Sequence, residues 1–123
     1  MLNLTQHPAT PAQIAVGVVD APAELEIGRM MTFDGLPSRE AINARADLIA
    51  VVARNWIEVQ NAPRSAMIGG APWFMSTMER ALKRHGIAPS YAFSQRASAE
   101  EMQSDGSVRK TQIFRHAGMI PAS

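Results

Sequence analysis

Three short apolar runs in this 123-residue chain are each followed directly by a small polar or glycine-rich peptide, with helix signals between them. The three peptides are Thr5-Gln6-His7, Gly69-Gly70 and Ser94-Gln95-Arg96. Strand patterns that alternate with helical patterns are typical of an α/β fold on a mostly parallel sheet. Because the carboxyl ends of parallel strands share one edge of the sheet, we expect the three peptides to converge on one small-molecule site.

Chain length and composition indicate a single folded domain over residues 1–123. Single domains commonly run about 100 to 150 residues, so a second domain would have no room. Hydrophobic residues make up 46% of the chain and charged residues 19%, which is ordinary for a soluble globular protein with a packed core. No stretch approaches the roughly 20 apolar residues of a membrane span, and the start of the chain lacks a signal-peptide pattern.

The charge balance and the absence of cysteine exclude several classes of function. A formal net charge of +1 is too small for non-specific binding to long nucleic acid, but it leaves a short anionic ligand open. A chain without cysteine has no disulfide and no thiolate nucleophile, which suits a reducing compartment, and we expect a cytoplasmic location. No histidine lies at ligand spacing from a carboxylate, so we expect no metal and no cofactor.

The first half of the chain predicts a strand, a short helix and a long helix. Residues 2–6 read as the first strand, and Thr10-Pro11-Ala12-Gln13 is a capping box that opens a helix with an apolar face reaching Val19. Residues 22–30 suggest another short helix, and residues 31–36 a connector or an edge strand. A long helix begins around Pro37 to Glu40 and ends at Asn61.

The second half predicts a strand, a helix and a hairpin. Ser65–Ile68 reads as a buried strand, and a helix follows from Pro72 to the left-handed stop at Gly86. A strand from Tyr91 towards Gln103 turns at Asp105-Gly106, and residues 108–120 return antiparallel to it. Centring the turn between Asp105 and Gly106 places His116 opposite Gln95, with Arg115 beside Arg96. These elements predict a small Rossmann-like three-layer α/β fold, with a mostly parallel sheet of about four strands and a C-terminal antiparallel β-hairpin.

Each polar peptide has both a chemical and a purely structural interpretation. At Gly69-Gly70-Ala71 the backbone and the amides of the next helix suit an anion, although a tight turn would need the same glycines. His7 can accept or donate a proton near neutrality, or it can be an exposed loop residue. Ser94, Gln95 and Arg96 suit a phosphate or a base edge, with Arg115 and His116 added from the return strand. The same residues would also fit the solvent face of a hairpin.

The opening Leu2-Asn3-Leu4-Thr5-Gln6-His7-Pro8-Ala9-Thr10, with the Gly69-Gly70 turn and the Ser94-Gln95-Arg96 strand end, resembles small CRISPR-associated Rossmann-like (CARF-like) proteins, some of which are ring nucleases. The resemblance implies a homodimer that binds a cyclic oligoadenylate across its two-fold axis and, in a nuclease, cleaves it without metal. His7 or His116 would then assist proton transfer and Arg96 would stabilise charge on phosphate. The remaining ligand-binding residues would be Thr5, Gln6, Gly69, Gly70, Ala71, Ser94, Gln95 and Arg115.

Two other functions remain open at this point. A non-enzymatic phage or defence-associated inhibitor or adaptor could bind another protein through its methionines and tryptophans, such as Met75 and Trp73. A hydrolase or transferase for another phosphorylated metabolite would use the same strand ends. A cleft lined by His7, Gly70 and Arg96 would favour a small ligand, whereas a flat apolar patch would favour a protein partner.

Overall fold

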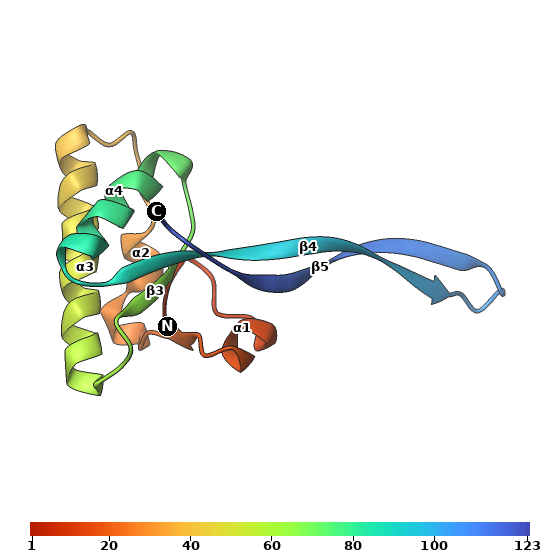
Figure 1. The fold of residues 1–123 in the computed structure, drawn as a ribbon. Helices are drawn as coiled ribbons and strands as arrows, with labels where there is room; N and C mark the ends of the chain where they lie inside the picture. Colours follow the sequence, from red (N-terminus) through yellow and green to blue (C-terminus); the bar gives the residue numbers. More distant parts are fainter.

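The computed structural model describes residues 1–123 and shows a mixed α/β fold on one five-stranded sheet of order β2-β1-β3-β4-β5 (Figure 1). Strands β2, β1, β3 and β4 run parallel, and β5 is antiparallel to β4. The strands are β1 (Leu2–Leu4), β2 (Val19–Asp20), β3 (Ser65–Ile68), β4 (Ala88–Met102) and β5 (Val108–Pro121). The helices are α1 (Pro11–Ala15), α2 (Ile27–Met30), α3 (Arg39–Gln60) and α4 (Pro72–Arg84), with a 3-10 turn η1 (Ala23–Leu25). None of the helices combines the length and apolarity that a membrane crossing needs.

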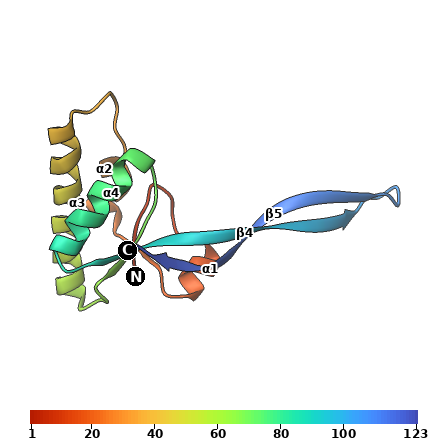
Figure 2. The ribbon, with the colours of Figure 1, turned by 45° about the horizontal axis from the view of Figure 1, so that its top comes forward.

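Helices α3 and α4 cover one face of the sheet, and the short α1 lies on the other side (Figures 1 and 2). The main core forms between the sheet and α3 and α4, where Leu4 and Ala53 are fully buried. A second, smaller cluster joins Ala9, Val18 and Met67 on the side of α1. Alternate residues of a buried strand therefore pack into different clusters: in β3, Ala66 and Ile68 belong to the main core and Met67 to the smaller one. This follows from the alternation of side chains along a strand.

The predicted helix boundaries are confirmed where capping residues mark them. Ser38 accepts a hydrogen bond from the Ala41 amide at 3.1 Å and begins α3, and Asn61 ends it in the left-handed conformation, with φ of 51°. Thr10 caps α1 as predicted: its hydroxyl accepts a hydrogen bond from the Gln13 amide, and the Gln13 side chain accepts one from the Thr10 amide. These bonds satisfy backbone groups that a helix end otherwise leaves unpaired.

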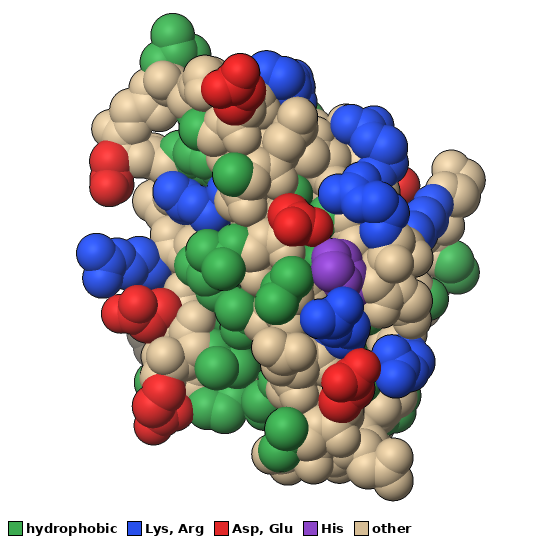
Figure 3. Space-filling view, turned by 90° about the vertical axis from the view of Figure 1, so that its left-hand side faces the viewer, with side chains coloured by type: hydrophobic (Ala, Val, Ile, Leu, Met, Phe, Trp, Pro, Cys, Tyr) green, Lys and Arg blue, Asp and Glu red, His purple; other side chains and the backbone are tan.

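His85 ends α4 and connects it to α3. Its Nδ1 lies 3.0 Å from an Arg54 guanidinium nitrogen, and its Nε2 lies 3.1 Å from an Asp47 oxygen. Because arginine can only donate, Nδ1 accepts and Nε2–H donates to the carboxylate. Figure 3 shows this outer face of the two helices, where basic side chains gather around one histidine. The predicted structural role of His85 fits these contacts.

The stretch after α1 differs from the prediction. The helix ends at Ala15, and Gly17 takes a φ of +100°, so the chain turns and Val19 enters a strand instead of a helical face. Val19 donates to the Met1 carbonyl at 2.9 Å and pairs in parallel with Leu2. The sheet therefore has five strands rather than about four. Two adjacent valines fit a helical face as well as a strand, which is why the pattern was ambiguous.

Residues 20–36 contain less regular structure than predicted. The helix expected over residues 22–30 is two short pieces, η1 and α2, separated by Glu26 in the left-handed conformation with φ of 53°. No strand forms between residues 31 and 36, so this segment is a connector.

Strands β4 and β5 extend beyond the body of the molecule as a long two-stranded ribbon (Figures 1 and 2). The antiparallel hairpin was predicted, but its register was wrong by one residue over the outer part. His116 pairs with Ser94 rather than Gln95, and Arg115 pairs with Gln95 rather than lying beside Arg96. The loop is centred on Asp105, and a β-bulge between Phe93 and Ser94 restores the predicted register only near the body.

The hairpin turn generates a prediction about pH. Asp105 accepts hydrogen bonds from the Ser107 amide at 2.9 Å and its hydroxyl at 2.6 Å, and these bonds hold the pKa of the carboxyl below its usual range. The stabilisation of the turn is therefore complete above the usual aspartate pKa, about 3.9, and is lost as pH falls through the lowered value. We expect Ser107→Ala to raise the Asp105 pKa in an NMR titration of its carboxyl carbon; an unchanged titration would contradict this.

Candidate functional site

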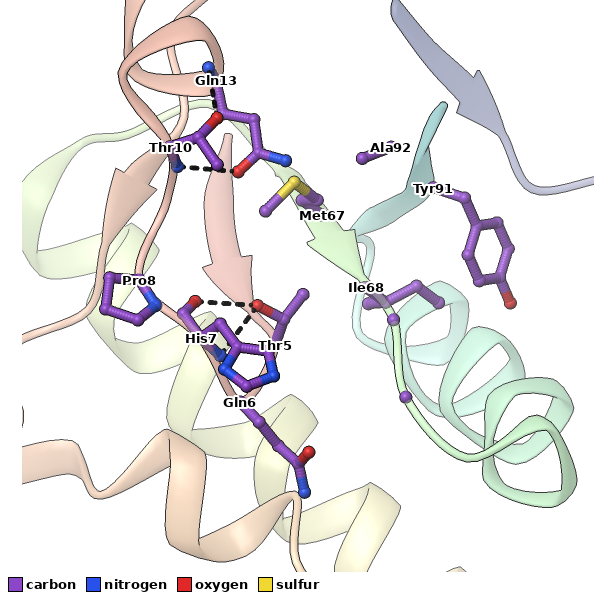
Figure 4. A pocket seen from close by; sticks show the side chains of 12 residues that line it. Thr5, Gln6, His7, Pro8, Thr10, Gln13, Met67, Ile68, Tyr91 and Ala92 are labelled. Atoms are coloured by element: carbon purple, nitrogen blue, oxygen red, sulfur yellow. Dashed lines mark hydrogen bonds between the residues drawn. The ribbon is translucent and has the colours of Figure 1, made fainter. Parts of the chain in front are cut away.

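An open hollow of about 380 Å³ lies where β1 and β3 end, beside the start of the ribbon. This volume is within the range of small-molecule sites, about 300 to 1,000 Å³. Figure 4 shows Thr5, His7 and Pro8 on one side of the hollow and Ile68 and Ala92 on the other. The lining residues are Thr5, Gln6, His7, Pro8, Thr10, Gln13, Met67, Ile68, Gly69, Gly70, Tyr91 and Ala92. Two of the predicted strand-end peptides therefore meet here, as the parallel topology led us to expect.

The loop that carries His7 is held by Asn3, which is only 4% exposed. The Asn3 amide group donates to the His7 carbonyl and to Asp20, both at 2.8 Å. Its oxygen accepts from the Thr5 amide at 2.9 Å and from the Thr5 hydroxyl at 2.7 Å. Each hydrogen-bonding position of this buried side chain is thus satisfied, which fixes the course of the chain at the end of β1.

Asp20 extends the same network from β2. Its Oδ1 accepts from Asn3 and from the Ala9 amide, at 2.8 and 2.9 Å. The loop is therefore bonded at both ends, to the strand that precedes it and to the strand beside it. Pro8 further restricts His7 to extended conformations.

The loop's own polar side chains are partly engaged in this structure. The Thr5 hydroxyl faces Asn3, and the Gln6 amide donates to the Met31 carbonyl at 3.3 Å and to the Thr32 hydroxyl at 3.1 Å. The His7 ring makes no hydrogen bond within the chain and is exposed. Among the three residues of this peptide, His7 is the one whose side chain is free for a ligand.

The Gly69-Gly70 turn forms the opposite side of the hollow. Gly70 has a φ of +151°, and a Cβ there would lie 3.5 Å from the end of the Met75 side chain. The next helix, α4, has no side-chain cap at its N-terminus. Ala71 is the N-cap residue of α4 and is not among the residues that line the hollow, and the expected anion-binding role of its backbone amide stays a prediction.

A second hollow of about 590 Å³ lies between α1 and the ribbon. It shares Thr10 and Gln13 with the first, so the two hollows adjoin at the start of α1, and we refer to the two together as the groove. The lining residues are Thr10, Pro11, Ala12, Gln13, Ser94, Phe114, Arg115 and His116. The β-bulge is what places His116 opposite Ser94, because a shift of one residue moves a side chain to the other face of a strand.

His116 is unusual in the second hollow because both of its ring nitrogens are buried and neither has a hydrogen-bond partner. An unpaired buried polar atom costs about 1 to 3 kcal/mol. A ligand in the hollow would have to displace the groups that cover these nitrogens before binding them.

Arg96 and Gln95 are separated by the alternation of the strand. Arg96 follows Ser94 on the same face, and its guanidinium lies 5.5 Å from the centre of the Phe114 ring, which is 68% exposed. Gln95 pairs with Arg115 and lines neither hollow. Arg96 itself lines neither hollow, but it stands beside Phe114, which lines the second one.

Tyr91 forms part of the wall but is not available as a base. Its hydroxyl donates to Glu79 on α4 at 2.6 Å, on the far side of the sheet from His7. Burial, the hydrogen bond to Glu79 and the charge of that carboxylate raise the pKa of Tyr91 well above its usual range. Nowhere in the chain do three or more His, Asp or Glu side chains come close enough to hold a metal ion.

The sequence reasoning missed Asn3 and Asp20 as residues that organise the site. A polar residue between Leu2 and Leu4, in a strand that is buried on both faces, was the signal for Asn3. No comparable signal marked Asp20, because the strand that carries it was not predicted. Thr10 and Gln13 were read as a helix cap only, and they also line both hollows.

The fold and the groove define an α/β protein with a polar ligand-sized site at the carboxyl edge of a mostly parallel sheet. The chain belongs to the family described as the uncharacterized protein MJ1673 family, whose model matches residues 1–119. No curated protein and no solved structure matches the chain.

The Asn3 network generates a stability prediction. Asn3→Ala would leave the Thr5 amide and the His7 carbonyl without their partner, so we expect the free energy of unfolding to fall by about 2 to 4 kcal/mol in urea titrations. The matched control is Asn55→Ala on the exposed surface of α3, which should change it by less than about 0.5 kcal/mol. Equal effects of the two substitutions would refute the role of Asn3.

Proposed function

We propose that this protein binds a cyclic oligoadenylate, or a related nucleotide second messenger, in the groove around α1 and cleaves it without metal. The observation that carries the proposal is the pair of joined hollows, which bring His7, the Gly69-Gly70 turn and the orphaned His116 into one groove. Each hollow lies within the size range of small-molecule sites, so two adjacent hollows suit a ligand of more than one nucleotide.

The groups along the groove match the parts of an oligonucleotide. Backbone at Gly69 and Gly70 can approach a phosphate closely, because neither residue has a side chain in the way. The exposed ring of Phe114, with Arg96 beside it, suits the stacking of a base and the charge of a phosphate. Neither hollow contains lysine, and the first contains no arginine, so the ribbon supplies the fixed positive charge.

The chemistry requires only groups that this chain has. A ribose 2′-hydroxyl attacks the adjacent phosphorus, so a bond from the 2′-oxygen to phosphorus forms and the bond to the 5′-oxygen breaks. One imidazole, from His7 or His116, takes the proton of the 2′-hydroxyl, and the imidazolium so formed, or water, gives a proton to the leaving 5′-oxygen. Arg96 stabilises the charge that develops on the phosphate oxygens. The product carries a cyclic 2′,3′-phosphate.

The arrangement of layers fits this proposal. Helices α3 and α4 would be one layer of a small Rossmann-like three-layer fold, and α1 would be a reduced third layer that leaves the groove open. The resemblance of the opening residues 2–10 to CARF-like ring nucleases supports the same assignment. A homodimer in a reducing cytoplasm would suit a cysteine-free chain that binds such a messenger.

A protein-binding role is the second candidate, and an apolar hollow away from the groove favours it. Phe33, Leu36 and Trp73 line this hollow; Leu36 is fully exposed and Trp73 is 46% exposed. Exposed apolar groups of this kind are common in protein interfaces. An inhibitor or adaptor would bind through this surface and would not need the groove.

The test mixes purified protein with cyclic oligoadenylates of several ring sizes and follows thermal shift and product masses. We expect binding of at least one ring and products that end in a 2′,3′-cyclic phosphate. His7→Ala or His116→Ala should slow cleavage by about 10² to 10⁴-fold, the usual contribution of a general acid or base. His85→Gln, on the far side of the molecule, is the matched control and should cleave at the normal rate. Absence of both binding and cleavage for every ring would refute the proposal.

A further inference from the structure

The ribbon has an open edge along most of β4. Strand β3 pairs with β4 only between Ala88 and Tyr91, so residues 92–102 have no neighbour on that side. The outer edge of β5 is also open, because β5 is the last strand of the sheet. A two-stranded ribbon is only marginally stable alone in water, and an open edge is a template for another strand. Both facts indicate that something pairs with this ribbon.

The charged side chains of the ribbon have no ion-pair partners within the chain. The four ion pairs of the structure all lie on the helices and their loops. The exposed charged residues of the paired strands are Arg96, Glu100, Glu101, Arg109, Lys110 and Arg115. Glu100 and Glu101 lie opposite Lys110 and Arg109 of β5, whereas Arg96 and Arg115 have no acidic residue opposite them, so the charges of these two arginines are available to a partner.

Two antiparallel copies of β4 can place each positive charge opposite a negative one, because Arg96 and Glu100 lie at equal distances on either side of Ser98. Around Ser98 the sequence is Gln95-Arg96-Ala97-Ser98-Ala99-Glu100-Glu101. In an antiparallel pair centred on Ser98, Arg96 lies opposite Glu100 of the second copy, and Glu100 lies opposite its Arg96. Ala97 and Ala99 face each other between these charged pairs, where small side chains make no clash. Opposite charges in directly opposed positions stabilise strand pairs.

We propose that two copies of this chain pair through the β4 edges, antiparallel and centred on Ser98, to give a continuous sheet of order β5-β4-β4-β5. The partner is a second copy because the complement of β4 is β4 itself. This interface stands on the ribbon alone and does not depend on the ligand of the groove.

The open edge begins just beyond Tyr91, where β3 ends, and residues 94–102 of one copy lie against residues 102–94 of the other. Residue 105 of each hairpin loop would then stand opposite Tyr91 of the other copy, which β3 already pairs, so the loop bends away from the sheet there. Strand β4 is then paired on both sides over nearly its whole length, first by β3 and then by the second copy.

Neighbouring strands strengthen the charge pattern across the four-stranded sheet. Glu100 pairs with Lys110 within its own ribbon, so in the dimer it lies between Lys110 and Arg96 of the second copy. Glu101 likewise pairs with Arg109 within its ribbon and faces Gln95 of the second copy. Each acidic side chain would then have a cationic side chain directly opposite it on a neighbouring strand.

The β5 edge is a poor alternative. Between Val108 and Pro121 it carries Arg109, Lys110 and Arg115 and no acidic residue, so two β5 edges would repel each other. The bulge and the terminal Pro121 also interrupt its regular pairing.

The register is tested by cysteine substitution, since the chain has no cysteine of its own. Ser98→Cys places two thiols face to face at the two-fold axis, within the Cα separation of about 4.4 to 6.8 Å that a disulfide requires. We expect rapid oxidation to a covalent dimer of twice the 13.3 kDa chain mass. Ala97→Cys is the matched control, because its opposite residue is Ala99, and it should crosslink much more slowly. Equal crosslinking of the two variants would overturn the register.

The charge pattern is tested by the oligomeric state in analytical ultracentrifugation. Arg96→Glu and Glu100→Arg each place like charges opposite one another twice per dimer, so each should raise the dimer dissociation constant at least about tenfold. The double variant with both substitutions restores opposite charges and should recover the dimer. Circular dichroism checks that each variant is folded. A wild-type protein that remains a single copy at all concentrations, or single variants with unchanged dimerisation, would overturn the proposal.

Discussion

The site depends first on one buried amide. Asn3 lies in the middle of a strand whose neighbours Leu2 and Leu4 belong to the main core, so its backbone position is fixed by packing. Its side chain points to the other side of the sheet and binds the loop after β1 and Asp20 on β2. The hydrophobic core is thereby coupled to the polar loop, and His7 is presented by a loop that is held rather than free.

The β-bulge has a comparable effect on the other side of the groove. If the register near the body continued along the ribbon without the bulge, His116 would pair with Gln95 and lie on the face opposite to Ser94. With it, the imidazole is buried against the groove with no internal partner. The groove thus depends on an irregularity in a strand, and bulges near binding sites commonly serve to redirect a side chain in this way.

Much of the fold was predictable because strong local signals agreed with the tertiary structure. Ser38 and Asn61 bound α3, and Pro72 and Gly86 bound α4, as the sequence indicated. Strand β2 was missed because a strand of two residues has no period, and its pairing with β1 decides its conformation. The register of the hairpin depends on the loop geometry and the bulge, neither of which has a distinct sequence signature here.

Part of the candidate site could likewise be predicted from the sequence, and part could not. The meeting of Thr5, Gln6 and His7 with Gly69 and Gly70 follows from parallel topology alone, so it could be predicted. The place of Gln95 and Arg96 outside both hollows could not be predicted, because it depends on the register and twist of the ribbon. The roles of Asn3 and Asp20 required knowledge of β2.

The spacing of charges on β4 also disfavours other registers of the β4–β4 pair. A slip of two residues keeps the same faces together and centres the pair on Ala97 or Ala99, where Arg96 and Glu100 no longer lie opposite each other. A slip of four residues centres it on Arg96 or on Glu100 and opposes identical charges, so among these registers only the centre at Ser98 pairs opposite charges. The remaining free edge belongs to β5, which is basic and bulged, so further strands would not add to it readily. Growth would stop at two copies, and an exposed edge that could seed fibres becomes a closed and symmetric interface.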